Sequence, residues 1–336
     1  MPKKMVRRNI NSAARKLKLQ QHNRLGQKLL MLPHNNPAFR PLTGIYEPSA
    51  IQQLPDGRFL VVEDEKQFPF SLFSIAADGR VSSTPLGSGL AESGDAFTKL
   101  ADLEGVTLDR AGFIYATTSH SRNTSGDEKK SRDKLVRFRI EGDNPVAPLV
   151  ASELKPALIA AHPALAVAAG IRDVKTSGGL NIEALEISPA QSLLIGFRSP
   201  LLDHKAIIAC LENPVAMFER GEAPRISPTL VTLDLDGNGI RGLSYLPALG
   251  GYLLISGPVA REEVHFQLWF WRGQPGDQAR RVTVDGLPGF AHAEGICPAV
   301  IAGQPWIVVV SDDGSREEGR CAGYLLLAPE QLQIAG

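Results

Sequence analysis

Short apolar runs recur along the chain, and each is interrupted by a tight turn. In residues 103–119, LEGVTLDRAGFIYATTS, runs of β-branched and aromatic residues flank Asp-Arg-Ala-Gly, which is the pattern of a β-hairpin. The pattern returns in residues 48–64, 182–199, 240–257 and 293–313. Further strand-like runs follow each copy, so every unit predicts about four antiparallel strands in roughly fifty to sixty residues.

Repeated four-stranded units of this length are typical of the blades of a β-propeller. The five copies predict an all-β fold in which residues 45–336 form one propeller of five blades. Six blades are the alternative, if residues 148–180 contain a degenerate blade. Residues 1–44 are expected to form an arm, whose end can supply a closing outer strand to the last blade.

The longest interval between repeats contains an Ala- and Leu-rich segment at about 148–176. Its composition, with Pro163 inside, predicts a short helical insertion of one or two helices between blades two and three. The insertion has two interpretations: a lid over a functional site, or a packed decoration of the fold.

Each hairpin opens with a polar residue where a buried strand is expected. These residues are Ser49, Glu104, Glu183, Arg241 and Glu294. In four copies another polar residue follows fifteen positions later: Asp64, Ser119, Arg198 and Ser256. Because the turn falls halfway, antiparallel pairing is expected to set the two opposite one another, and Asp312 or Asp313 takes that place in the fifth copy. The innermost strands line the channel of a propeller, so all of these residues are predicted to converge around one axis.

Three or more carboxylates in one ring repel one another unless a cation lies among them. One alternative is that Arg241 and Arg198 neutralise the ring as buried ion pairs, which would make it a structural plug. The other is a metal ion, for which oxygen ligands indicate calcium. The excess of acids over arginines favours calcium, held by Glu104, Glu183, Glu294 and Asp312.

Two histidines, His120 and His292, lie beside this ring in the sequence. Each is a candidate general base, with a hydrogen-bonded wall residue as the alternative. Arg122, Arg198 and Arg241 are candidate substrate-binding groups that would clamp an anion. The chain contains no GxSxG, HExxH or GxxxxGK[ST] motif, so the usual serine-hydrolase, zinc-protease and P-loop functions lack support.

Four segments carry a resemblance to a known family: residues 103–123, 181–201, 237–258 and 293–314. They resemble a bacterial domain-of-unknown-function family of β-propellers, which is distantly similar to the phytase-like family described as "esterase-like activity of phytase". The resemblance implies calcium-dependent hydrolysis with axial carboxylates as ligands, at Glu104, Glu183 and Glu294. Arg241 stands where that pattern would have a fourth acid.

The formal net charge is zero, but the charge is unevenly distributed. Residues 1–46 contain ten Lys or Arg and no acid, which indicates a solvated tail, an arm for an anionic partner, or an organellar-type transit peptide. Nucleic acid is not favoured as that partner, because no aromatic residues are interleaved with the basic ones. The chain lacks a secretory signal and any segment of membrane-spanning length, and its three cysteines form no CxxC, so we expect a cytoplasmic protein.

Two functional hypotheses follow from the sequence. The first is a calcium-dependent hydrolase of a phosphoester, ester or lactone, working at the propeller axis. The second is a non-catalytic binding module that recognises a small anionic ligand or a protein partner.

Overall fold

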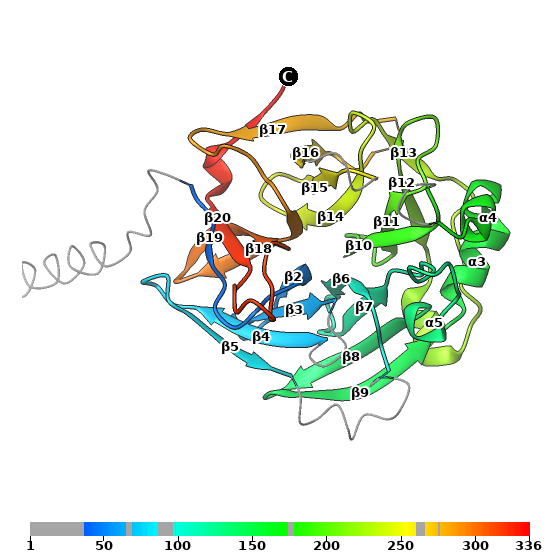
Figure 1. Ribbon diagram of the computed structural model, residues 1–336, viewed down its shortest axis with the longest axis horizontal. Coiled ribbons are helices and arrows are strands. Elements are labelled where there is room, and N and C mark those ends of the chain that lie inside the picture. Colours follow the sequence, from blue (N-terminus) through cyan, green and yellow to red (C-terminus); the bar gives the residue numbers. More distant parts are fainter. Residues whose placement is uncertain are drawn as a thin grey trace, which may run out of the picture.

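The computed structural model describes residues 37–64, 69–86, 97, 99–173, 178–259, 266–274 and 276–336. Most of the basic arm therefore lies outside the described residues. Five antiparallel sheets are arranged around a central axis (Figure 1). The protein is a five-bladed β-propeller, as predicted, and the six-blade alternative is wrong, because residues 148–173 hold the end of one strand and two helices.

The first three blades are formed by consecutive strands. Blade one contains β2 (Pro48–Gln53), β3 (Phe59–Glu63), β4 (Phe70–Ile75) and β5 (Val81–Pro85). Blade two contains β6 (Leu103–Leu108), β7 (Ile114–Thr118), β8 (Leu135–Glu141) and β9 (Asn144–Ala151). Blade three contains β10 (Asn181–Ile187), β11 (Leu193–Ser199), β12 (Ala206–Leu211) and β13 (Val231–Leu233).

The last two blades each take in a strand from one end of the described chain. Blade four contains β14 (Gly239–Leu246), β15 (Gly251–Gly257), β16 (Gln267–Trp271), β17 (Arg280–Val284) and β21 (Leu332–Ile334). Blade five contains β18 (Ala293–Ile301), β19 (Gln304–Ser311), β20 (Gly323–Leu327) and β1 (Arg40–Pro41). Strand β1 pairs with β20 and β21 pairs with β17, so both ends cover an outer sheet edge.

Two helices, α3 (Leu154–Ala161) and α4 (Pro163–Gly170), form the insertion between blades two and three. They lie at the periphery of the ring (Figure 1). Leu154, Leu158 and Leu165 pack into the same apolar cluster as Ile182 of β10. The helices are therefore anchored in the core. A third helix, α5 (Pro214–Arg220), follows β12, and short 3-10 turns lie at Lys130–Arg132 and Pro329–Gln331.

Two further features of the described residues bear on the sequence-based expectations. None of their helices has the length and apolar character needed to cross a lipid bilayer. All three cysteines are free, with Cys297 buried and Cys210 and Cys321 half-buried.

The first strands of neighbouring blades, β2, β6, β10, β14 and β18, pack against one another around the axis. Each has an irregularity in its pairing with the next strand, and β10 has two, because Arg198 of β11 is also left out of the ladder. On the first strand, the residue left without a partner is in every case the leading polar residue: Ser49, Glu104, Glu183, Arg241 or Glu294. A β-bulge of this kind inserts one extra residue and turns its side chain away from the ladder.

The predicted ladder pairing of residues fifteen positions apart is therefore wrong, although in blade three Glu183 and Arg198, both left out of the ladder, contact each other at 3.1 Å. In blade four, for example, Ser256 pairs with Ile240, and Arg241 is skipped before Gly242 pairs with Ile255. The sequence pattern locates the polar residues correctly. Because the bulged residue has no partner, the residues before and after it pair with a register that differs by one residue.

A small residue follows each bulged residue, and close packing around the axis explains it. These residues are Ala50, Gly105, Ala184, Gly242 and Gly295. A Cβ atom on Gly105 would lie 2.7 Å from Cβ of Leu185 in the next blade, and one on Gly295 would lie 3.0 Å from Cα of Ala50. The polar-small pair is thus a steric requirement for inner strands that meet at the axis.

Further along the inner strand of blade three, Glu186 is buried and forms no ion pair with any cation in the described part of the chain. Its carboxylate accepts hydrogen bonds from the Thr107 hydroxyl at 3.1 Å and the Tyr245 amide at 3.0 Å. Loss of hydration outweighs these bonds and raises the pKa of Glu186 to about 8. The group is therefore mostly protonated at neutral pH.

This shift predicts a pH dependence of stability. The folded protein holds the Glu186 proton more tightly than the unfolded chain, so the free energy of unfolding should be highest below the ordinary pKa of 4.5 and fall toward about 8. We expect Glu186→Gln to reduce this fall, while the other carboxyl groups of raised pKa, Asp64, Glu104 and Asp312, keep their part of it. Urea unfolding at about pH 5 and about pH 8 measures it. The exposed Glu141→Gln is the matched control, and an unchanged slope in Glu186→Gln would contradict the assignment.

Candidate functional site

The five bulged residues, which we call the axial ring, surround a cavity of about 610 Å³, the axial cavity. The cavity is lined by Ser49, Asp64, Asp102, Glu104, Ser121, Arg122, Asn123, Thr124, Ser125, Gly126, Arg132, Arg172, Asp173, Asn181, Glu183, Arg198, Arg241, Glu294 and Asp312. Every lining residue except the glycine is polar or charged. Such a wall, as far as the described residues form it, suits a hydrophilic ligand.

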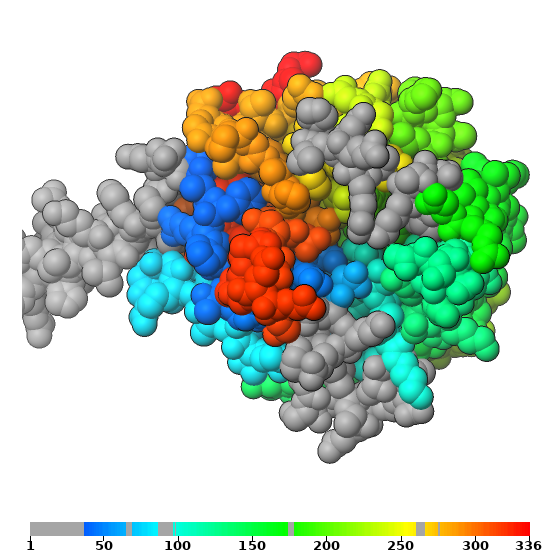
Figure 2. Space-filling model, viewed as in Figure 1, coloured from blue at the N-terminus to red at the C-terminus, as the bar shows by residue number. Residues whose placement is uncertain are grey.

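The segment that follows Asp312 forms part of the protein surface beside blade one. Figure 2 shows it in orange-red next to the blue residues at the start of the described chain. The Arg316 guanidinium lies 4.2 Å from the ring centroid of Tyr46. Blades five and one are thus also joined through loops outside their strands.

Arg241 is the central cation of the axial ring. Its Nη1 atom lies 2.6 Å from Oε1 of Glu294 and 2.8 Å from Oε2 of Glu183. Burial works against the charged guanidinium, but the surrounding glutamates outweigh it and raise the pKa of Arg241 above its ordinary value. Glu183 also contacts Nη1 of Arg198 at 3.1 Å and accepts a hydrogen bond from the Asn181 amide at 2.7 Å.

Three other carboxyl groups in the cavity pair with no cation of the described residues: Asp64, Glu104 and Asp312. Asp64 and Asp312 lie where their side chains reach water, yet the surrounding protein removes part of their hydration. With the nearby carboxylates, this raises the pKa of each to about 7. Glu104 is less accessible, and loss of hydration together with Glu183 raises its pKa well above the ordinary value. Asp64 and Asp312 can therefore exchange protons near neutral pH.

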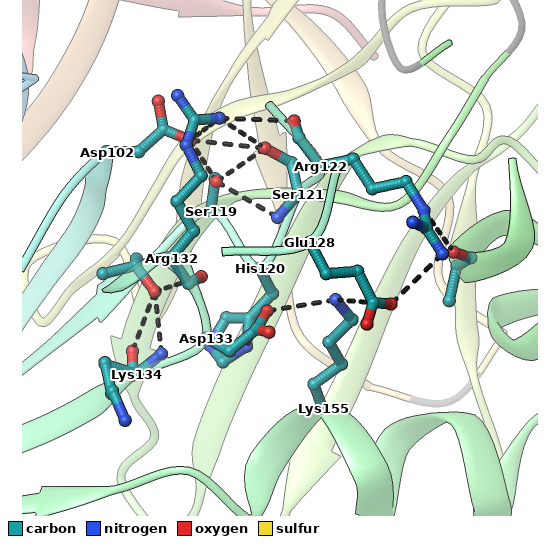
Figure 3. A network of polar contacts seen from close by, with 12 residues as sticks. Asp102, Ser119, His120, Ser121, Arg122, Glu128, Arg132, Asp133, Lys134 and Lys155 are labelled. Carbon is teal, nitrogen blue, oxygen red and sulfur yellow. Dashed lines mark hydrogen bonds and ion pairs between the residues drawn. The ribbon is translucent and has the colours of Figure 1, made fainter. Parts of the chain in front are cut away.

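One wall of the cavity is a hydrogen-bonded network after β7 (Figure 3). The Asp102 carboxylate accepts a hydrogen bond from the Ser119 hydroxyl and lies 2.8 Å from Nη1 of Arg132. Arg132 also donates to the Ser121 hydroxyl at 3.0 Å, and Ser121 lines the cavity. The network holds the Ser121 side chain in place at the cavity wall.

A second set of contacts ties this wall to the helical insertion (Figure 3). Arg122 donates to the carbonyl of Ala169 in α4 at 3.1 Å and pairs with Glu128 at 3.1 Å. Lys155 of α3 pairs with Asp133 at 3.0 Å. Residues 172–173, which follow α4, line the cavity. The insertion is packed against the core, and its end contributes to the site.

The two histidines predicted as general bases are not among the residues that line the cavity. His120 is fully buried, its Nε2 atom lies 3.1 Å from the Thr117 hydroxyl, and burial lowers its pKa to about 3. His292 is exposed, with its ring 5.7 Å from that of Phe266. Both have left-handed backbone conformations, with φ of 54° and 59°, and so are turn residues at strand ends. Neither histidine therefore lines the axial cavity formed by the described residues, and their role as general bases stays a prediction.

The cavity also contains residues that the sequence did not single out, namely Asp102, Ser121 and Arg132. Asp102 precedes its bulge by two positions, as His292 does in blade five, and both have positive φ. Arg132 comes from a loop outside the repeat and has no such signal.

The four residues predicted as calcium ligands all line the cavity, but they do not form one coordination sphere. Arg241 bridges Glu183 and Glu294. Among the described residues, no three His, Cys, Asp or Glu side chains converge in a way that can hold a metal ion. The predicted set therefore does not fit an ion while Arg241 is in place.

Fold and cavity together define a five-bladed propeller with a polar axial site. The chain is similar in fold to the PQQ-bound aldose sugar dehydrogenase of Streptomyces coelicolor, with 16% identity, a TM-score of 0.43, and coverage of 89% of this chain and 99% of that one. A gluconolactonase from Xanthomonas campestris matches with 11% identity, a TM-score of 0.39, and coverage of 90% and 88%. An exo-β-1,3-galactanase from Phanerochaete chrysosporium matches with 10% identity, a TM-score of 0.48, and coverage of 90% and 67%.

No family model and no curated protein matches the chain. At these identities the structural similarities concern the fold alone. The class of protein is therefore a β-propeller, and its function has to be argued from its own axial cavity.

Proposed function

We propose that this protein is a hydrolase that cleaves an ester-type bond of a hydrophilic substrate bound in the axial cavity. The observation that carries the proposal is the group of carboxyls with raised pKa in a fully polar cavity: Asp64, Glu104 and Asp312. Raised carboxyl pKa values near neutrality suit general acid–base catalysis.

Two of these groups divide the proton transfers between them. Asp64, with a pKa of about 7, is partly ionised at neutral pH and takes a proton from the attacking water. Glu104 holds its proton and gives it to the leaving oxygen as the ester bond breaks. After the reaction Asp64 carries one proton more and Glu104 one proton fewer. Proton exchange with water then restores both groups. Arg241 provides the positive charge beside the reacting group.

The lining of the cavity favours an ester or a lactone over a phosphoester. Arg122 is held by Ala169 and Glu128, Arg198 by Glu183, and Arg241 by two glutamates. The arginines predicted to clamp an anion are therefore already paired within the protein. Asp64, Glu104 and Asp312 form no ion pair among the described residues, and Ser49, Ser121, Asn123 and Thr124 also line the cavity. Such groups suit the hydroxyls of an uncharged substrate.

The proposal is tested by assaying uncharged lactones, carboxylic esters and phosphoesters with the wild type and Asp64→Asn. We expect lactone or ester turnover whose rate falls below about pH 7, and a loss of roughly 100-fold in Asp64→Asn. The exposed Asp78→Asn, in the same blade, is the matched control. Saturable binding with no turnover of any compound would instead support a non-catalytic binding module.

A further inference from the structure

The axial ring already contains a cation of its own. Arg241 belongs to the bulge of β14, and it contacts Glu183 of blade three on one side and Glu294 of blade five on the other. Only 9% of Arg241 is exposed, and Glu183 and Glu294 are equally inaccessible, at 4% and 7%. A charge pair this well shielded from water interacts strongly and is costly to break from one side.

The fold provides space for the stem of Arg241. A Cβ atom on Gly257 would lie 2.9 Å from Cγ and 3.1 Å from Nε of Arg241. The Phe266 ring lies 5.4 Å from its guanidinium carbon. Gly257 is the last residue of β15, so the same hairpin that carries the arginine leaves the room for it. The fold therefore has a defined place for the Arg241 side chain inside the ring.

We propose that Arg241 takes the place of an axial metal ion, so that the ring becomes a divalent-cation site only when this side chain loses its charge. A divalent ion at the ring would have to displace the guanidinium from Glu183 and Glu294 or lie against it, and like charges at contact distance repel. Without the guanidinium, Glu104, Glu183, Glu294 and Asn181 still line one cavity, and their side chains would have to turn toward one another to coordinate an ion. Carboxylate and amide oxygens are the ligands calcium prefers.

The test is the melting temperature of the full-length protein in EGTA and after CaCl2 is added back. We expect no change in the wild type. Arg241→Gln should melt lower than the wild type in EGTA and then gain roughly 5 °C with calcium, because an ion that binds only the folded form stabilises it. Arg241→Lys keeps the charge and should show no calcium response. Arg198→Gln, which removes an arginine paired with Glu183 alone, is the matched control and should show none either.

Two results would overturn the proposal: calcium stabilisation of the wild type, or no calcium response in folded Arg241→Gln. If Arg241→Gln does not fold, the double variant with Glu104→Gln reduces the uncompensated negative charge. This double variant should fold. It should bind calcium less tightly than Arg241→Gln that has been refolded in the presence of calcium. Failure of calcium to recover that refolding would also overturn the proposal. The readout is melting or folding, so the result does not depend on the proposed hydrolase activity.

Discussion

Replacing Glu104 by glutamine is expected to lower turnover by at least about 100-fold while the propeller stays folded. Glu104 is a bulged residue at the axis and forms no ion pair with the described residues. Glutamine has the shape of the protonated carboxylic acid but cannot release its proton to a leaving group. Because burial and then the neighbouring carboxylates raise the pKa of Glu104, a neutral amide at this position avoids both the cost of burying a charge and the repulsion.

The measurement is kcat together with the melting temperature. Glu141→Gln, an exposed substitution in the same blade, provides the matched control for the loss of one carboxylate. If the variant melts at or above the wild-type temperature but its kcat is lost, the loss comes from the chemical step and not from unfolding. An unchanged kcat would remove Glu104 from the mechanism.

Replacing Gly242 by alanine is expected to destabilise the fold by about 3 kcal/mol. The added Cβ would overlap the carbonyl oxygen of Glu294, an atom of the neighbouring inner strand. Backbone cannot move aside as a flexible side chain can, and five inner strands packed around one axis leave little freedom to shift. The same movement would also displace the carboxylate that Arg241 binds.

Urea unfolding checks this prediction against Gly170→Ala. Gly170 lies in α4, where an added Cβ would meet no atom within 4 Å, so that substitution is expected to be neutral or slightly stabilising. Equal stabilities of the two variants would show that the inner strands can separate, and would weaken the steric explanation of the polar-small pairs.

Much of the fold was predictable because its signals are local and repeated. Alternating apolar runs and a tight turn define a hairpin within about twenty residues, and five copies indicated five blades. The Ala- and Leu-rich segment indicated helices, and Leu154 and Leu165 bury their side chains as a packed insertion requires. The same repetition identified all five residues of the axial ring, since equivalent positions in a closed ring lie at the same height on the axis.

The contents of the site were less predictable. His120 lies next to Ser119 in sequence, yet a left-handed turn removes it from the cavity, whereas Arg132 enters from a loop that no repeat marks. The register of each hairpin was wrong near the bulge, because one extra residue changes which side chains face one another. The sequence favoured calcium because acids outnumber arginines in the ring. That number does not show that Arg241 forms ion pairs with Glu183 and Glu294.

By itself, the sequence determined the blades, the inserted helices and the residues of the axial ring, because hydrophobic periodicity and turn chemistry act over a few residues. Only the tertiary structure decided that Arg241 bridges Glu183 and Glu294, while Asp64, Glu104 and Asp312 remain without a cation partner among the described residues. Electrostatic energy depends on distance and solvent access, and both arise from the closure of blades far apart in the chain.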